Sequence, residues 1–100
     1  MVQIGAPDGW DLSVGANTVV IAILDTGCDL SHEDLSGKYV PVADRRDVVA
    51  GTDTPEDDLG HGTCCAGIAA AESNNNQGVA GVAWNCRIMP VRTIGNQGYY

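Results

Sequence analysis

Residues 18–24, with the sequence TVVIAIL, form a continuous apolar run that is rich in β-branched side chains. Such a run is typical of a parallel strand that is buried on both faces of its sheet. The run ends abruptly at Asp25-Thr26-Gly27, so we expect Asp25 to lie at the carboxyl end of the strand. In open α/β sheets, ligands and catalytic groups gather at that end of the strands. The stretch therefore predicts both a sheet and the place of a functional site.

The rest of the chain alternates between helix and strand patterns. Residues 61–72 are small and compatible with a helix that packs closely on a sheet, and residues 87–94 predict a second strand. Residues 39–42 predict one further short strand. The order strand, loop, helix, strand implies an α/β layered fold, in which a parallel sheet packs against helices, and a length of 100 residues allows one domain. Residues 1–17, rich in Gly, Asp and Pro, predict a lead-in arm.

Two residues are of types that are unfavourable in the helix or strand predicted for them. Gly67 in the predicted helix costs about 1 kcal/mol relative to alanine, so we expect close packing at this position. Pro90 in the second strand has no N–H group for a ladder, so we expect that strand to be bulged or irregular.

The amino-acid composition limits the classes of binding partner that we expect for the chain. The 100 residues include 5 Lys and Arg against 13 Asp and Glu, which gives a formal net charge of −8. Such a charge repels phosphate backbones and anionic lipid, so we expect neither a nucleic-acid nor a membrane partner. No run approaches the roughly 18 apolar residues of a membrane-spanning helix.

The four cysteines are Cys28, Cys64, Cys65 and Cys86. Sequence neighbours such as Cys64 and Cys65 rarely bond to each other, and the scatter of the others does not form a disulfide framework. We therefore expect mostly reduced thiols.

Asp25 and His61 are the candidate catalytic residues. Asp25 ends the most apolar strand, and His61, within Gly60-His61-Gly62-Thr63, begins the predicted helix. In such a fold both positions face one crevice. There a carboxylate can hold the tautomer of an imidazole and stabilise its protonated form, while the helix dipole keeps the resting imidazole neutral.

The segments ILDTG at 23–27 and GHGT at 60–63 resemble the aspartate and histidine motifs of the subtilisin-like serine proteases, the subtilases. The resemblance implies a fold with three layers in the full domain and hydrolysis of peptide bonds, with Asp25 and His61 as two members of a Ser-His-Asp triad. The family's nucleophile motif, glycine-threonine-serine-x-alanine, is absent from these residues. We therefore expect the N-terminal fragment of a catalytic domain, inactive alone, from a parent that is extracellular if it is typical of the family.

The resemblance continues beyond the two motifs. Asp29, His32 and Leu35 match the stretch after the catalytic aspartate, and residues 91–94 match the strand that leads to the substrate. In the family, an extended peptide substrate pairs as an added strand with the segment that follows. The substrate-binding residues implied in this way are Ile94, Gly95 and Gly98.

A calcium site is also implied by the resemblance. The family builds it from a carboxylate, an asparagine side chain and loop carbonyl groups, which are the oxygen ligands that calcium prefers. The matching residues are Asp34 and Asn75 through their side chains and Ser73, Gln77 and Val79 through their carbonyl oxygens. The alternative is a solvated asparagine loop without an ion.

The cysteines near His61 depart from the usual pattern. Cys64 stands where the family usually has a second histidine, and Cys65 resembles the proteinase K branch, in which a thiol lies beneath the catalytic histidine. A Cys65–His61 protease and a zinc site of His61, Cys64 and Cys65 are both weaker hypotheses. The first lacks an evident oxyanion hole, and the second lacks a fourth ligand.

Two other functions stay open. Asp25-Thr26-Gly27 after an apolar strand also resembles a homodimeric, retroviral-type aspartic protease, in which each chain gives one carboxylate to a shared dyad. The other alternative is a non-catalytic binding or assembly module. In the family's sheet the strand at residues 18–24 has a neighbour on each side, so an unpaired apolar edge here would favour self-association.

Overall fold

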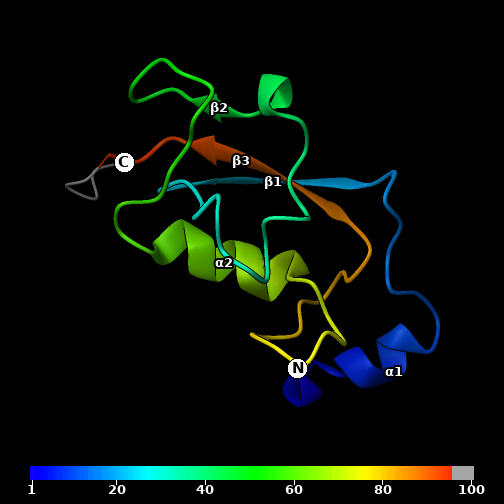
Figure 1. Ribbon diagram of the computed structural model, residues 1–100. Coiled ribbons are helices and arrows are strands. Elements are labelled where there is room, and N and C mark those ends of the chain that lie inside the picture. Colours follow the sequence, from blue (N-terminus) through cyan, green and yellow to red (C-terminus); the bar gives the residue numbers. More distant parts are fainter. Residues whose placement is uncertain (96–100) are drawn as a thin grey trace.

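The computed structural model describes residues 1–95 and contains one small parallel sheet with a helix on one face (Figure 1). The strands are β1 (Val20–Asp25), β2 (Arg46–Asp47) and β3 (Arg87–Arg92), and their order in the sheet is β1-β3-β2. The main helix, α2 (His61–Ala70), packs mostly against β1. The α/β class with a parallel sheet is thus confirmed. No helix in the described part of the chain has the length and apolar character that a bilayer crossing requires.

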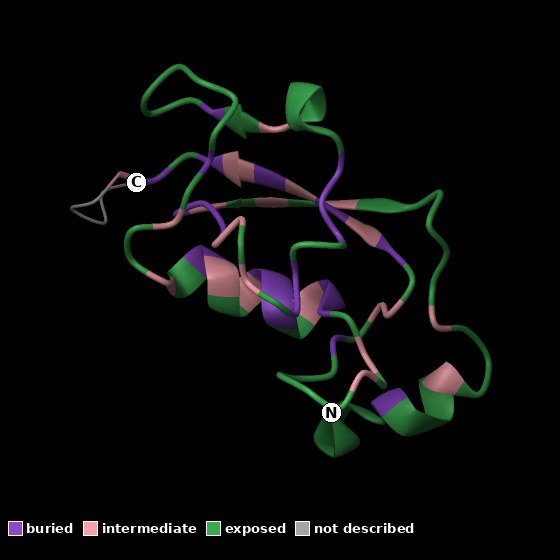
Figure 2. Ribbon diagram, in the orientation of Figure 1, coloured by how far each residue is buried: buried purple, intermediate pink, exposed green. Residues whose placement is uncertain are grey.

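Strand β1 is less buried than its sequence predicts. Ile21 and Ile23 pack against the core, whereas Val20 is 47% exposed and Leu24 is 62% exposed. The expectation of burial on both faces is therefore wrong within the described residues. Only one face of β1 is covered, by α2 and the core, and β1 is an edge strand of this sheet (Figure 2).

Pro90 sits in β3 without disturbing it. The register pairs β1 and β3 residue by residue, from Val20 with Arg87 to Asp25 with Arg92, so the predicted bulge is wrong. The N–H and C=O groups of Ile88 point away from β1, to Lys38 O (2.8 Å) and Val40 N (2.9 Å). Pro90, two residues later, faces the same side, where β2 pairs only with Val91 and Arg92. Its missing N–H therefore costs no ladder bond.

The short strand predicted at residues 39–42 does not form. Tyr39 makes an isolated bridge to Ile88, and the chain then turns into η2, a 3-10 helix over Val42–Asp44. Pro41 precedes η2, and it cannot donate to a continuing ladder. The third strand forms later instead, as the two-residue β2.

The core lies between α2 and the sheet. It consists of small and medium side chains, namely Cys28, Leu35, Tyr39, Ala66, Ala70, Ala71 and Ile88. Alanines at the helix surface allow the α2 backbone to approach β1 closely. All four cysteines have free thiols, as the sequence predicted.

The lead-in arm is folded rather than extended. It contains η1, a 3-10 helix over Val2–Ile4, and α1, a short helix over Ala6–Trp10. The Trp10 ring packs against Trp84 with centroids 4.7 Å apart, and its Nε1 donates to the Val82 carbonyl at 2.8 Å. These contacts hold the arm against the segment that precedes β3.

Candidate active site

Asp25 and His61 meet at the carboxyl end of the sheet. Asp25 is the last residue of β1 and His61 the first of α2. His61 Nδ1 lies 2.8 Å from Asp25 Oδ1 and 2.9 Å from Oδ2. The Asp25 side chain is 14% exposed and the His61 side chain 67% exposed. The carboxylate therefore holds one ring nitrogen, and the other edge of the imidazole is open to a reacting group.

The carboxylate of Asp25 is kept ionised by its neighbours. Burial alone would raise its pKa, but the Thr26 N–H, which donates to Oδ1 at 2.7 Å, and the His61 ring together lower the pKa below its usual value. An ionised Asp25 favours the Nδ1–H tautomer of His61 and stabilises the imidazolium form.

Asp57, which the sequence analysis did not single out, fixes the start of α2. Its Oδ1 accepts hydrogen bonds from the N–H groups of Leu59 (2.9 Å) and Gly60 (2.8 Å), and its Oδ2 accepts one from the Thr63 N–H (2.9 Å). Burial raises the pKa of Asp57, but the Thr63 hydroxyl, which donates to Oδ2 at 2.5 Å, and these N–H groups lower it to about 2. Gly60, the N-cap residue, has no side chain for this task, so a carboxylate three residues earlier satisfies the free N–H groups.

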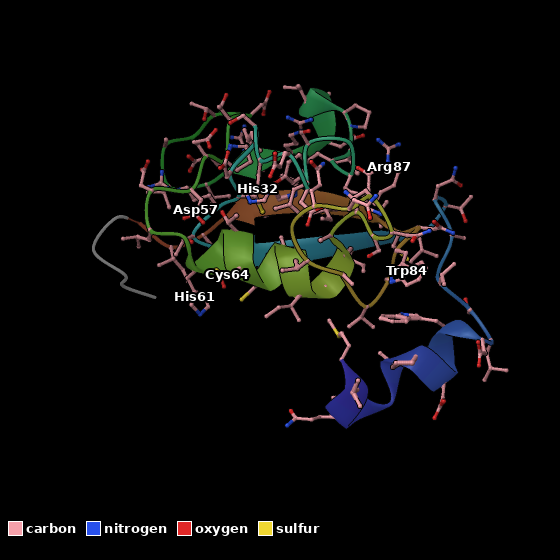
Figure 3. All side chains as sticks on the ribbon, turned by 60° about the horizontal axis from the view of Figure 1, so that its bottom comes forward. His32, Asp57, His61, Cys64, Trp84 and Arg87 are labelled. Atoms are coloured by element: carbon pink, nitrogen blue, oxygen red, sulfur yellow. The ribbon has the colours of Figure 1, made fainter. Side chains whose placement is uncertain are left out.

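The same carboxylate connects both catalytic segments. The Thr26 hydroxyl donates to Asp57 Oδ1 at 2.8 Å and accepts the Gly62 N–H at 2.9 Å. Thr26 follows Asp25 and Gly62 follows His61, so these bonds fix the two candidate catalytic residues relative to each other. The labels in Figure 3 show His61 and Asp57 at the same end of α2.

Two glycines allow this close approach. A Cβ atom on Gly62 would collide with the Gly27 carbonyl oxygen and lie 3.2 Å from the Asp25 Cβ. Gly27 has φ of +100°, and a Cβ there would lie 2.5 Å from the Pro55 carbonyl oxygen. Gly67, for which we expected close packing, would place a Cβ only 3.7 Å from Val79, an ordinary contact. The glycine of α2 that packing requires is thus Gly62.

Cys65 lies beside the catalytic pair and Cys64 does not. Cys65 Sγ is 3.7 Å from His61 Nδ1. The atoms of Asp25, His61 and Cys65 that could bind a metal ion all lie within 4.8 Å of one another. Cys64 is exposed on another face of α2. Burial, together with the Asp25 charge, raises the pKa of the Cys65 thiol, which therefore stays protonated. The cluster near His61 is not the predicted His61, Cys64 and Cys65 set, because Asp25 takes the place of Cys64.

The candidate calcium residues lie at the other end of α2. Asp34 is 1% exposed, and its carboxylate accepts hydrogen bonds from Asn75 Nδ2 (2.9 Å) and the Val79 N–H (2.7 Å). A Cβ on Gly78 would collide with this carboxylate. The Ser73 hydroxyl donates to the Ala71 carbonyl, and Gln77 belongs to the same loop. The structure thus brings Asp34, Asn75 and Val79 together around one buried carboxylate.

Ile94 and Gly95, two of the predicted substrate residues, follow β3 directly. The Ile94 N–H lies 3.2 Å from the Asp25 carbonyl oxygen, and the Ile94 side chain is 8% exposed. The segment therefore leaves the sheet next to Asp25. Gly98 lies outside the described residues.

Comparison with known proteins finds a match to one family. The Subtilase family model matches residues 16–100. Thermitase from Thermoactinomyces vulgaris is 46% identical over 96 residues, which cover 96% of this chain and 33% of thermitase. A calcium-dependent protease from Trichormus variabilis is 43% identical over 93 residues, covering 89% of this chain and 13% of that protein.

A solved structure shows the same fold. The serine protease of Aeromonas sobria, in complex with its chaperone, matches with a TM-score of 0.73 and 28% identity. The match covers 85% of this chain and 14% of that chain. The chain thus spans a minor part of each of these proteins.

Proposed function

The chain belongs to the subtilase family, and on that premise we propose that it supplies the aspartate and histidine of a serine endopeptidase site. The observation that carries the proposal is the contact of His61 Nδ1 with both oxygens of Asp25, at 2.8 Å and 2.9 Å. The substrate class is a peptide bond in a protein or peptide.

In this proposal His61 is the general base. Because Asp25 engages Nδ1, the exposed Nε2 is the nitrogen that takes a proton from the nucleophile and later gives it to the leaving amine. Asp25 orients the ring and stabilises the imidazolium that forms between these steps.

The nucleophile is proposed to come from a segment outside these 100 residues. The Ser31 hydroxyl donates to Asp29 and the Ser73 hydroxyl to Ala71, both away from His61. Among residues 1–95, the His61 ring contacts only Asp25 and Cys65 through its polar atoms. The base and the nucleophile act as one unit, so the chain alone is expected to be inactive.

Two further elements of the proposal concern the substrate and calcium. We propose that an extended peptide pairs with the segment that holds Ile94, Gly95 and Gly98, because that segment begins beside Asp25. We also propose that calcium binds Asp34 and the Asn75 side chain, with carbonyl oxygens of Ser73, Gln77 and Val79. A single buried carboxylate with an amide and loop carbonyls is an oxygen-rich donor set that fits calcium, provided that Asn75 turns its amide oxygen inward.

The calcium element has its own test. Calcium that binds only the folded chain raises the melting temperature with concentration, and a chelator reverses the rise. We expect Asn75→Ala to lose this response, and to melt at a lower temperature than the wild type without calcium because the buried Asp34 carboxylate loses a donor. An equal calcium response in Asn75→Ala would contradict the assignment.

The acid–base assignment can be tested on the chain itself by NMR of its two histidines. His61 is expected as the Nδ1–H tautomer because Asp25 accepts from Nδ1. His32 is the internal control and is expected as the Nε2–H tautomer, because its Nδ1 accepts the Asp34 N–H at 3.1 Å. Long-range proton–nitrogen spectra distinguish the two tautomers. An Nε2–H tautomer at His61 in the wild type, or no change at His61 in Asp25→Ala, would refute the proposed roles.

The aspartic dyad is a separate alternative with a separate outcome. It requires peptidase activity at low pH that Asp25→Asn abolishes and His61→Ala leaves intact. The contact between Asp25 and His61 favours the serine protease.

A further inference from the structure

A polar cavity of about 780 Å³ lies at the end of the sheet opposite to His61. Its lining includes Lys38, Glu72, Trp84 and Arg87, and we call it the Lys38 cavity. Arg87 begins β3, whereas Asp25 pairs with Arg92 at the far end of that strand. Figure 3 shows Trp84 and Arg87 on one side of the molecule and His61 on the other. The cavity is therefore separate from the catalytic pair.

Lys38 is buried with most of its donors unused. The residue is 9% exposed, and its ammonium group donates to the Trp84 carbonyl oxygen. An ammonium group has three N–H donors. Within residues 1–95 no carboxylate lies within ion-pair distance of Lys38. Burial lowers the Lys38 pKa, and the nearby Cys86 and Glu72 only partly oppose this. A buried cation without a direct counter-charge is costly, so an anionic partner would be stabilising.

Trp84 adds a second unused donor. Its Nε1 is buried and has no hydrogen-bond partner among the described residues. The ring is held by its contact with Trp10, whose own Nε1 is satisfied by the Val82 carbonyl. Buried polar groups are normally paired, and Trp84 lines the cavity, so its unpaired N–H is a group that a bound acceptor would satisfy.

The local charge favours an anion although the whole chain is acidic. Lys38 and Arg87 contribute two positive charges to the cavity against one negative charge from Glu72. The Arg87 guanidinium is held in place by a hydrogen bond from Nη2 to the Tyr39 carbonyl at 2.9 Å. With a net charge of −8, the remainder of the chain repels anions, so any anion binding must come from such a local group.

We propose that the Lys38 cavity binds a small oxyanion, which accepts hydrogen bonds from Lys38 Nζ and Trp84 Nε1 and is flanked by Arg87. Phosphate, sulfate and carboxylate share the required chemistry, which is several acceptor oxygens around one negative charge centre. The site does not depend on the proteolytic function.

The test is a titration of the chain with inorganic phosphate at constant ionic strength, followed by the indole N–H signals in proton–nitrogen spectra. We expect the Trp84 signal to shift and saturate, and the Trp10 signal, whose donor is already paired, to shift much less. Sodium chloride at equal ionic strength should cause no saturable shift. The absence of a saturable Trp84 shift, or equal linear shifts of both indoles, would overturn the proposal.

Matched variants locate the site. Lys38→Met should weaken phosphate binding by about tenfold or more, because a charged hydrogen-bond donor is lost. Arg46→Gln removes the same charge at an exposed position and should leave the affinity within about twofold of the wild type. Wild-type affinity in a folded Lys38→Met variant would refute the site. If that variant does not fold, Glu72→Gln serves instead. It removes the cavity's negative charge and must tighten phosphate binding, so unchanged or weaker binding would refute the proposal.

Discussion

Replacement of Asp57 by asparagine should destabilise the chain in a manner that depends on pH. In the wild type the pKa of Asp57 is held at about 2, against a usual value of 3.8, by hydrogen bonds from Thr63, Gly60 and Leu59 that outweigh burial. This difference corresponds to about 2 kcal/mol of stability at pH 7. Because the folded pKa is the lower one, the contribution is complete above pH 3.8 and is lost as the pH falls toward 2. At pH 3 about 1 kcal/mol should remain.

The assay is urea unfolding of the wild type and Asp57→Asn at pH 7 and pH 3, with the unfolding free energy extrapolated to water. We expect the unfolding free energy of Asp57→Asn to be about 2 kcal/mol below that of the wild type at pH 7, and this difference to shrink by about half at pH 3. Asp53→Asn is the matched control. The side chains of Asp53 and its ion-pair partner Arg46 are both 53% exposed, so Asp53→Asn should lower the unfolding free energy by less than about 1 kcal/mol. A difference for Asp57→Asn that does not change with pH, or that equals the control, would refute the role given to this carboxylate.

Three further outcomes follow from the packing. Gly62→Ala should lower the unfolding free energy by about 1 to 3 kcal/mol, because the added methyl group meets a backbone carbonyl. Gly67→Ala should raise the unfolding free energy by up to about 1 kcal/mol. Thermal melts that rank the two variants in the opposite order would contradict this. Arg92→Met should cost about 3 kcal/mol in urea unfolding, because it leaves Asp47, which is 2% exposed, without its 3.1 Å ion pair. A cost below about 1 kcal/mol would mean that Asp47 is stabilised in another way. The open edge of β1 should cause concentration-dependent association in light scattering, and a monomer at all concentrations would contradict it.

The strands and the helix that carry the catalytic pair could be predicted from local sequence. The apolar run before Asp25 and the small residues after His61 are strong local patterns, and both elements form close to the predicted places. The meeting of Asp25 with His61 followed from the general rule for carboxyl ends of parallel strands. These features depend on neighbours in sequence or on a rule of the fold class.

Features that depend on distant contacts were predicted less well. Pro90 is tolerated because its missing N–H faces away from β1, on the side where the β2 pairing begins only at Val91, which periodicity does not reveal. The outer face of β1 is exposed because no described element covers it. Asp57 was missed because its partners include Thr26, far away in sequence. The signal that could have found it is an acidic residue shortly before a helix that begins with glycine.

The central claim is that Asp25 and His61 form the acid–base half of a serine endopeptidase site. Its most direct test is the hydrolysis of a chromogenic peptide by the protein translated from the whole reading frame that contains this chain. We expect His61→Ala to lower kcat/KM by about four orders of magnitude or more, with no low-pH optimum that depends on Asp25 alone. Peptidase activity that survives His61→Ala would contradict the account.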